Sequence, residues 1–186
     1  CVILFLWVGM GIASTEAADS YQPLAVEPGR TPRHTEFEFT DITRNRTIPL
    51  RIYRCEGVKA APVVIFSHGL GGSREGSQYL GEHWAKRGFI AVFTQHPGSD
   101  EGVWKNARLA QRMAAMREAA NLENTLLRVQ DISAVIDHLE KWNQEPDHDL
   151  QGLLDLAHLG MSGHSFGAVT TQLVSGQTTI RRGATD

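Results

Sequence analysis

The sequence predicts an α/β fold, in which a mostly parallel sheet carries helices on both faces. Short apolar runs rich in β-branched and aromatic residues alternate with segments whose apolar residues recur at helical spacing. Strands that alternate with helices in this way favour parallel pairing and right-handed crossovers. The 186 residues are also enough for one such domain with one hydrophobic core.

The expected elements follow one another without internal repeats. In chain order they are strands at 36–43 and 46–55 joined at Arg44-Asn45, a strand at 62–67, a helix at 77–87, a strand at 89–94 and a helix at 126–142. The first two alternate as antiparallel strands do, whereas PVVIFS at 62–67 is typical of a strand buried on both faces. Gly88 is expected to stop the first helix, whose inner face carries Leu80 and Trp84.

A segment before the last helix, Lys105 to Ala120, also has apolar residues at helical spacing. They are Leu109, Met113, Met116 and Ala120. A helix inserted here could cap the mouth of an active site, whereas a surface helix packed on the body of the domain would show the same pattern. The sequence leaves both alternatives open.

The residues Gly163-His164-Ser165-Phe166-Gly167 form a G-x-S-x-G motif between an apolar run and a helical pattern. A serine hydroxyl is a weak nucleophile, and enzymes that use one hold it on a sharp strand-to-helix turn. Side chains at Gly163 and Gly167 would collide with neighbouring backbone in such a turn. The motif therefore predicts that Ser165 is a catalytic nucleophile, although a glycine-rich turn between two core elements could have the same residues.

A second glycine-rich motif, His68-Gly69-Leu70-Gly71-Gly72, directly follows the strand at 62–67. In enzymes with this nucleophile turn, one oxyanion donor is the N–H after the serine, and the other lies in a loop after an earlier strand. We therefore assign the donors to the backbone N–H groups of Leu70 and Phe166, and the oxyanion loop to His68, Gly69 and Gly71. A flexible turn would explain the glycines but not their position relative to Ser165.

Four ordered segments resemble the bacterial predicted dienelactone hydrolases, which group with the plasma-type platelet-activating-factor acetylhydrolases in the α/β-hydrolase superfamily. The segments are FSHGLGGSREG (66–76), QHPGSD (95–100), RVQDISAVIDHL (128–139) and GMSGHSFGA (160–168). The resemblance covers roughly residues 36–180. It implies an α/β-hydrolase fold and a secreted serine esterase or lipase-like hydrolase with Ser165 as nucleophile and Leu70 and Phe166 as oxyanion donors. Ala168 departs from the pattern, because the family often has a second glycine there.

The sequence does not supply a complete catalytic triad. In this fold the acid and then the histidine follow the serine, but all eight histidines precede Ser165 and only Asp186 follows it as a carboxylate. We therefore expect residues 36–186 to be the N-terminal part of an α/β-hydrolase domain, truncated after the nucleophile helix. His68 and His164 are the local alternatives for the base, and their places in the oxyanion loop and the elbow argue against them.

The N-terminal residues have a different character. Residues 2–12 form an apolar stretch of the length of a signal-peptide core and are too short for a membrane span. We expect residues 1–17 to be a partial signal peptide cleaved after Ala17, and the protein to be exported to the periplasm or the medium. A short anchor helix is the alternative. Residues 18–35 are expected to form an extended, proline-containing and mobile segment.

Composition excludes several other functions. A net charge of −3 provides no basic field for nucleic acid. The two cysteines, Cys1 and Cys55, make no disulfide framework, and Cys55 is expected to be a lone thiol in a core or edge position. No ligand cluster predicts a metal, no cofactor is expected, and His96 with Asp100 is interpreted as a turn after a strand. The expected partner is a small-molecule ester or lipid, with no stable membrane span after processing.

Two functional hypotheses follow. The first is an exported carboxylic-ester hydrolase that forms an acyl-enzyme at Ser165, with short acyl esters, acetylated phospholipids or lactones as the substrates that the resemblance suggests. The second is a non-catalytic α/β-hydrolase remnant or binding domain that keeps the elbow as a scaffold. Codons after Asp186 that encode a strand-end Asp and a later His would favour the first hypothesis, and a stop codon the second. The strand ending at Met161 is expected to be an open edge, which predicts self-association of the chain.

Overall fold

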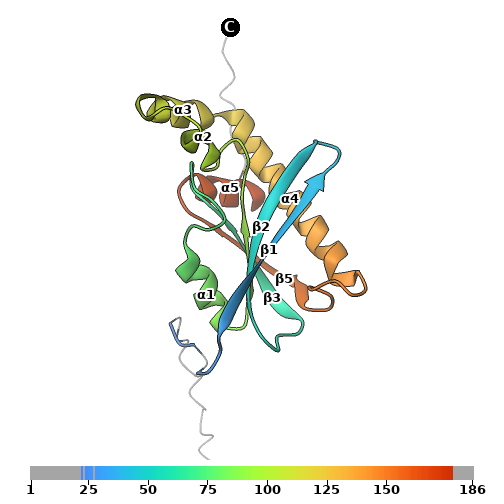
Figure 1. Cartoon of the computed structure of the whole chain (residues 1–186). Coiled ribbons are helices and arrows are strands. Elements are labelled where there is room, and N and C mark those ends of the chain that lie inside the picture. Colours follow the sequence, from blue (N-terminus) through green and yellow to red (C-terminus); the bar gives the residue numbers. More distant parts are fainter. Residues whose placement is uncertain (1–21, 23, 27, 178–186) are drawn as a thin grey trace, which may run out of the picture.

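The computed structural model describes residues 22, 24–26 and 28–177. The predicted signal peptide, Cys1 and Asp186 lie outside these residues. One sheet of five strands forms the centre of the domain, with the strand order β1-β2-β4-β3-β5 (Figure 1). Helices lie on both faces of this sheet, as the sequence predicts.

The strands are β1 (Pro32–Asp41), β2 (Arg46–Cys55), β3 (Ala61–Ser67), β4 (Ile90–Thr94) and β5 (Leu154–Gly163). The helices are α1 (Gln78–Lys86), α2 (Gly102–Lys105), α3 (Arg112–Ala119), α4 (Leu122–Gln144) and α5 (Phe166–Val174), with a 3-10 turn at Leu109–Gln111. All the strands and helices expected at 36–94 and 126–142 are present. However, β1 begins inside the segment expected to be extended, because Pro32 already pairs with Cys55 of β2.

The sheet is mixed, so the prediction of a mostly parallel sheet is wrong. Antiparallel pairs join β1 to β2 and β2 to β4, whereas β3 is parallel to both β4 and β5. A short connection can only join antiparallel strands, and the turn between β1 and β2 is tight, with Asn45 at a φ of 48°. Parallel pairing is confined to strands whose connections contain a helix.

Alternation along the strands divides the core into two layers. In β4, Ile90 and Val92 join the larger cluster, which Ile132 and Val135 of α4 cover. Ala91 and Phe93 belong to the smaller cluster on the other face, against α1. Figure 1 shows α1 and α4 on opposite sides of the sheet. Leu80 and Trp84 pack against the smaller cluster, and Gly88 ends α1 with a φ of 90°, both as predicted.

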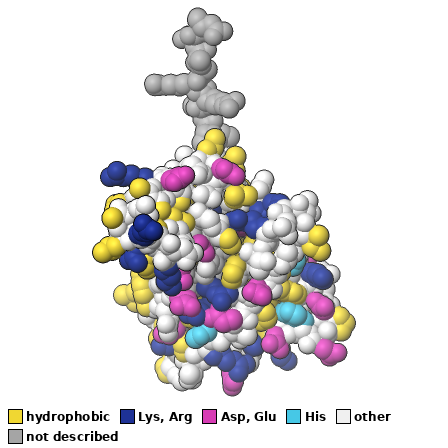
Figure 2. Space-filling model, turned by 45° about the horizontal axis from the view of Figure 1, so that its top comes forward, with side chains coloured by type: hydrophobic (Ala, Val, Ile, Leu, Met, Phe, Trp, Pro, Cys, Tyr) yellow, Lys and Arg dark blue, Asp and Glu magenta, His cyan; other side chains and the backbone are white. Residues whose placement is uncertain are grey.

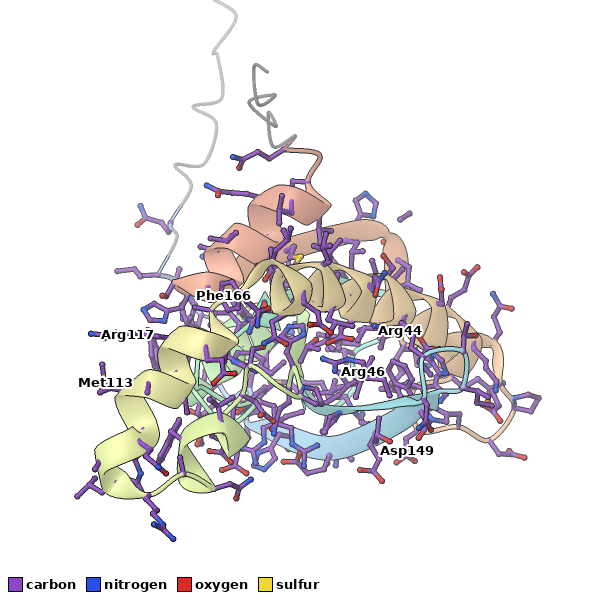
Figure 3. All side chains as sticks on the ribbon, turned by 90° about the horizontal axis from the view of Figure 1, so that it is seen from above. Arg44, Arg46, Met113, Arg117, Asp149 and Phe166 are labelled. Carbon is purple, nitrogen blue, oxygen red and sulfur yellow. The ribbon has the colours of Figure 1, made fainter. Side chains whose placement is uncertain are left out.

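The segment 105–120 is not one helix, so that prediction is wrong. An extended residue, Arg108, separates α2 from the 3-10 turn and α3. Leu109 and Met113 are 80% and 67% exposed, and Figure 3 shows Met113 on α3 at the margin of the molecule. Most of the apolar residues at this spacing therefore face solvent. The end of α3 packs inward, where Ala119 is buried.

The outer edge of β5 is exposed among the described residues. β5 pairs with β3 alone, and its residues 157–160 are exposed. The sequence predicted that the strand ending at Met161 would be an open edge, and Leu154 at the start of β5 is its one buried residue. Figure 2 shows acidic and basic side chains interspersed over the visible face, with hydrophobic side chains among them.

Candidate active site

The backbone at Ser165 is strained. Its φ of 53° and ψ of −115° lie in a region that residues other than glycine rarely occupy. β5 ends at Gly163 and α5 begins at Phe166, so Ser165 occupies the turn between strand and helix and is exposed. This is the geometry of a nucleophile elbow. The strain provides a structural reason to regard this serine as functional.

Gly163 and Gly167 fit the elbow because neither position has room for a side chain. A Cβ at Gly163 would overlap the carbonyl group of Gly167, and a Cβ at Gly167 would overlap the carbonyl group of Ser67. The sequence predicted such collisions with neighbouring backbone. The missing Cβ at Gly167 also lets α5 contact the end of β3, where the oxyanion loop begins. Elbow and oxyanion loop are thus held together by main-chain contact.

The predicted oxyanion loop lies against the elbow. A Cβ built on Gly69 would be 3.4 Å from Cβ of Ser165, and the N–H of His164 donates to the carbonyl of Ser67 at 3.2 Å. Within the described residues, the N–H groups of Leu70 and Phe166 donate no hydrogen bond. Both N–H groups are therefore free to bind a ligand, and their role as oxyanion donors stays a prediction.

The loop is fixed on its far side by the segment after β4 and by α2. The N–H of Gly71 donates to the carbonyl of Ser99 at 2.9 Å, and the N–H of Glu101 donates to the carbonyl of Gly72 at 2.8 Å. Trp104 of α2 donates its indole N–H to the carbonyl of Gly71 at 2.7 Å. Residues 99–104 therefore brace the oxyanion loop, a role that the sequence pattern did not indicate.

A cavity of about 260 Å³ opens at this point. Its lining residues include Leu70, His164 and Ser165, together with glycines of the oxyanion loop. A larger hollow of about 830 Å³ lies beside the outer face of β5 and α1, at the opposite ends of the strands. Ligands of open α/β sheets bind at the carboxyl ends of the strands, and only the smaller cavity is lined by a strained serine. We therefore assign the candidate site to the smaller cavity.

His68 is a structural residue of the loop. Its Nε2 accepts the N–H of His96 at 3.0 Å, so its Nδ1 carries the proton and donates to the carbonyl of Gly69 at 2.7 Å. Burial lowers the pKa of His68 to about 4, which keeps the ring neutral at pH 7. Because both ring nitrogens are occupied, His68 is not available as a base for Ser165. His164 is exposed, and its ring lies beside Gly69.

A buried relay lies beneath the loop. Asp131 accepts a hydrogen bond from Nδ1 of His96 at 2.9 Å, and Nε2 of His96 lies 3.0 Å from the Ser67 hydroxyl. The order of partners is that of a catalytic triad, but the Ser67 side chain is 0% exposed and cannot reach a substrate. Burial lowers the pKa of His96 to about 3, so this ring is also neutral. We interpret the relay as part of the polar core.

Charged groups in this core were missed from the sequence. Arg128 and Asp131 of α4 are both 0% exposed, and Asp131 is bound by Arg44 at 2.8 Å and Arg46 at 2.7 Å. Burial raises the pKa of Asp131, but hydrogen bonds from His96 and Arg46 outweigh it and hold the pKa below its ordinary value. Figure 3 shows Arg44 and Arg46 between α4 and the sheet. The signal was available: positions 128 and 131 share the helical period of the buried Ile132 and Val135.

Acid is expected to destabilise the protein through His68 and His96. Their pKa values of about 4 and 3 lie below the ~6.5 of an unfolded histidine, so between pH 6.5 and 4 the unfolded chain binds more protons. Each histidine then lowers the free energy of unfolding by about 1.4 kcal/mol per pH unit. Urea unfolding at pH 7, 6 and 5 measures this slope. A stability equal at pH 7 and 5 would refute the assignment.

The described residues contain no other evident chemistry. No group of three or more His, Cys, Asp or Glu side chains among them could hold a metal ion. None of the helices in the described ranges has the length and apolar character that a bilayer crossing requires. Cys55 is buried and unpaired at the end of β2, consistent with the predicted lone thiol.

Sequence comparisons connect this site to known hydrolases. The model of the family described as platelet-activating factor acetylhydrolase, isoform II, matches residues 49–103, which include the oxyanion loop. A protein of Bacillus subtilis (strain 168) named as an esterase, YitV, is 26% identical over 114 residues, which are 61% of this chain and 38% of YitV.

Solved structures with the same fold are also esterases or hydrolases by name. A cold-adapted esterase from an Arctic intertidal metagenomic library is 17% identical with a TM-score of 0.52, over 81% of this chain and 59% of its own. A ferulic acid esterase from Streptomyces cinnamoneus is 17% identical with a TM-score of 0.55, over 78% and 55%. A protein from Klebsiella pneumoniae named as a dienelactone hydrolase is 15% identical with a TM-score of 0.57, over 78% and 56%.

The chain spans less than two thirds of the length of each of these relatives. At identities below 20% the structures establish the fold, and they do so for about four fifths of this chain. The sequence matches and the resemblance of the ordered motifs agree with that fold. The chain therefore has an α/β-hydrolase-like fold and is similar, over part of its length, to esterases and hydrolases with that fold.

Proposed function

We propose that this chain is the N-terminal part of a serine carboxylic-ester hydrolase that forms an acyl-enzyme at Ser165. One observation carries the proposal: a strained, exposed serine between two obligatory glycines lies beside a loop with a free N–H donor. Strain of this kind is concentrated at functional sites, where surrounding structure maintains it. The esterase names of the relatives support the same reaction class.

The proposed chemistry follows from the geometry. The Oγ of Ser165 attacks the ester carbonyl, and a base takes the hydroxyl proton. The carbonyl oxygen becomes an oxyanion, which accepts hydrogen bonds from the N–H groups of Leu70 and Phe166. Collapse of the tetrahedral adduct expels the alcohol, which takes up the proton, and water then hydrolyses the acyl-serine. Each donor contributes roughly 10²–10³-fold to turnover in comparable sites.

The base and the acid of the triad are proposed to come from sequence beyond residue 186. Among the described residues no histidine is hydrogen-bonded to the Ser165 hydroxyl, and His68 and His96 have both ring nitrogens engaged. The order of the triad in this fold also places acid and base after the serine. The relatives are longer than this chain, which supports the same proposal.

The substrate and the location are the finer parts of the proposal. The similarity to platelet-activating factor acetylhydrolases and dienelactone hydrolases suggests short acyl esters, including acetylated phospholipids and lactones, as the proposed substrates. Turnover of p-nitrophenyl esters of increasing acyl length would rank them. Export is proposed from residues 2–12, and the protein recovered outside the cytoplasm should then begin at Ala18.

A serine-directed phosphonate tests the nucleophile. We expect the protein extended through its downstream sequence to be labelled, and Ser165→Ala to abolish the labelling, because Ser165 is an exposed serine on a strained strand-to-helix turn. Ser162→Ala is the matched control, since Ser162 precedes the motif on β5 and should leave labelling unchanged.

Two outcomes would contradict parts of this proposal. Labelling that survives Ser165→Ala would refute the assignment of the nucleophile, because another residue would then be the one that reacts. If the extended protein is not labelled at all, the result would favour a non-catalytic domain. Rapid labelling of the 186-residue chain by itself would show instead that its own residues supply the base.

A further inference from the structure

Arg128 is a buried cation that joins four parts of the candidate site. Its side chain reaches from α4 and is 0% exposed. Its Nε donates to Thr170 of α5 at 3.0 Å, and its Nη1 donates to Ser99 in the segment after β4 at 3.0 Å. Its Nη2 donates to the Ser67 hydroxyl at 3.0 Å and to the carbonyl of His68. One rigid guanidinium thus contacts the oxyanion loop, its brace and the nucleophile helix.

The same guanidinium also lies against the elbow. Its Cζ is 4.8 Å from the centre of the Phe166 ring, within the range of a cation–π contact. Phe166 contributes one of the two assigned oxyanion donors. The Phe166 carbonyl accepts a hydrogen bond from the Thr170 hydroxyl at 3.1 Å. Arg128 therefore contacts the ring of Phe166, and Thr170 binds its backbone.

The second donor, the Leu70 N–H, is oriented through the Gly69 carbonyl, one peptide group after the carbonyl that Arg128 binds. The carbonyl of His68 begins the loop, and the His68 ring donates to the next carbonyl, that of Gly69. Gly69 and Leu70 share one peptide group, in which the C=O and the N–H point in opposite directions. A Gly69 carbonyl held by His68 therefore turns the Leu70 N–H to the opposite side.

Stability alone does not account for an arginine at this position. A buried ion is costly to desolvate, and apolar residues of similar volume often serve a core equally well or better. Burial lowers the pKa of Arg128 to about 10, which leaves it charged at neutral pH. Leucine or methionine at position 128 would fill the space but could not bind the four hydrogen-bond acceptors that Arg128 binds.

We propose that Arg128 is a positioning residue of the oxyanion hole, which fixes the oxyanion loop against the nucleophile helix so that the Leu70 and Phe166 N–H groups converge. The inference rests on the proposed ester hydrolase function. Arg128 does not touch the substrate. It acts through His68, Thr170 and Phe166, and its effect should therefore appear in the stabilisation of the transition state.

Arg128→Lys in the complete enzyme tests this role, with p-nitrophenyl acetate as substrate. Lysine keeps the charge but cannot span the three elements, because its ammonium is a single point. We expect kcat to fall about 10- to 100-fold while KM changes less than threefold, since small displacements of catalytic donors have effects of this size. A trifluoromethyl ketone that forms a tetrahedral adduct with the serine should bind more weakly by the same factor as kcat/KM falls.

Arg44→Lys is the matched control. Arg44 binds Asp41 and Asp131 from the turn between β1 and β2, and the same substitution there should change stability without lowering kcat. Equal losses of kcat in both variants would refute the inference, because the effect would then be a general loosening of the core. A folded Arg128→Lys variant with wild-type kcat would also refute it.

A second variant covers the case in which Arg128→Lys does not fold. Thr170→Val preserves shape but removes the acceptor of the Arg128 Nε, and we expect kcat to fall about 3- to 10-fold at constant KM. An unchanged kcat in a folded Thr170→Val variant would then contradict the inference. Ser165→Ala separates the two proposals: if it leaves turnover intact, the proposed function itself is wrong.

Discussion

Gly167→Ala is expected to lower the free energy of unfolding by at least about 3 kcal/mol and kcat/KM by at least about 10²-fold. The added Cβ would overlap the Ser67 carbonyl and lie 2.8 Å from the carbonyl oxygen of His68. Both neighbours are main-chain atoms at the junction of β3 and the oxyanion loop, so neither can rotate away. Either α5 or the loop must shift, and each movement separates the nucleophile from its oxyanion donors.

Urea unfolding and p-nitrophenyl acetate kinetics on the complete enzyme measure both effects. Gly160→Ala is the control, because a Cβ there would be 3.9 Å from the carbonyl oxygen of Val63, which is an ordinary van der Waals contact. The interpretation of the elbow would be wrong if Gly167→Ala kept both stability and turnover while the chain remained folded.

Asp131→Asn is expected to lower the free energy of unfolding by about 3–5 kcal/mol. The substitution keeps the shape of the side chain but removes the anion that binds Arg44 and Arg46 and balances the buried Arg128. Without this carboxylate the buried arginines lack a counter-ion, and water cannot reach them to solvate their charge. Turnover should fall as well, because Arg128 and His96 contact the ends of β3 and the oxyanion loop.

Glu56→Gln removes the same charge from an exposed pair and serves as the comparison. Glu56 and its partner Arg33 have side chains that are 76% and 49% exposed, so the change should lower the free energy of unfolding by about 1 kcal/mol or less. Equal losses in the Asp131 and Glu56 variants, measured by urea unfolding, would show that the buried network does not stabilise the fold as argued.

Sequence reasoning was most successful where the determining interactions are local. The run at 62–67 predicts β3, and the two glycines around Ser165 predict an elbow, because a strand's burial and a turn's steric limits can be seen in adjacent residues. The segment 105–120 was mispredicted because helical spacing alone cannot distinguish one helix from short helices separated by an extended residue such as Arg108.

The polar core could not be predicted with the same method. His96 was interpreted as part of a turn, yet it lies between Ser67 and Asp131, from two other elements. A hydrogen bond between residues so distant in sequence depends on the packing of α4 against the sheet, which a pattern of apolar residues does not specify. The sequence indicated the polar core in one way: charged residues stand at positions 128 and 131, within the apolar face of α4.

The pairing of β3 with β5 also has a consequence for the order of events during synthesis. Ser67 pairs with Gly163, roughly 100 residues later in the chain. At ~5–20 residues per second, the ribosome takes roughly 5–20 s to supply the second strand after the first. Throughout this interval the edge of β3 that later pairs with β5 has no hydrogen-bond partner. Arg128 is also synthesised before Thr170, the acceptor of its Nε–H. The oxyanion loop after β3 is therefore synthesised before the nucleophile elbow after β5. During that interval the unpaired edge of β3 can pair with other strands.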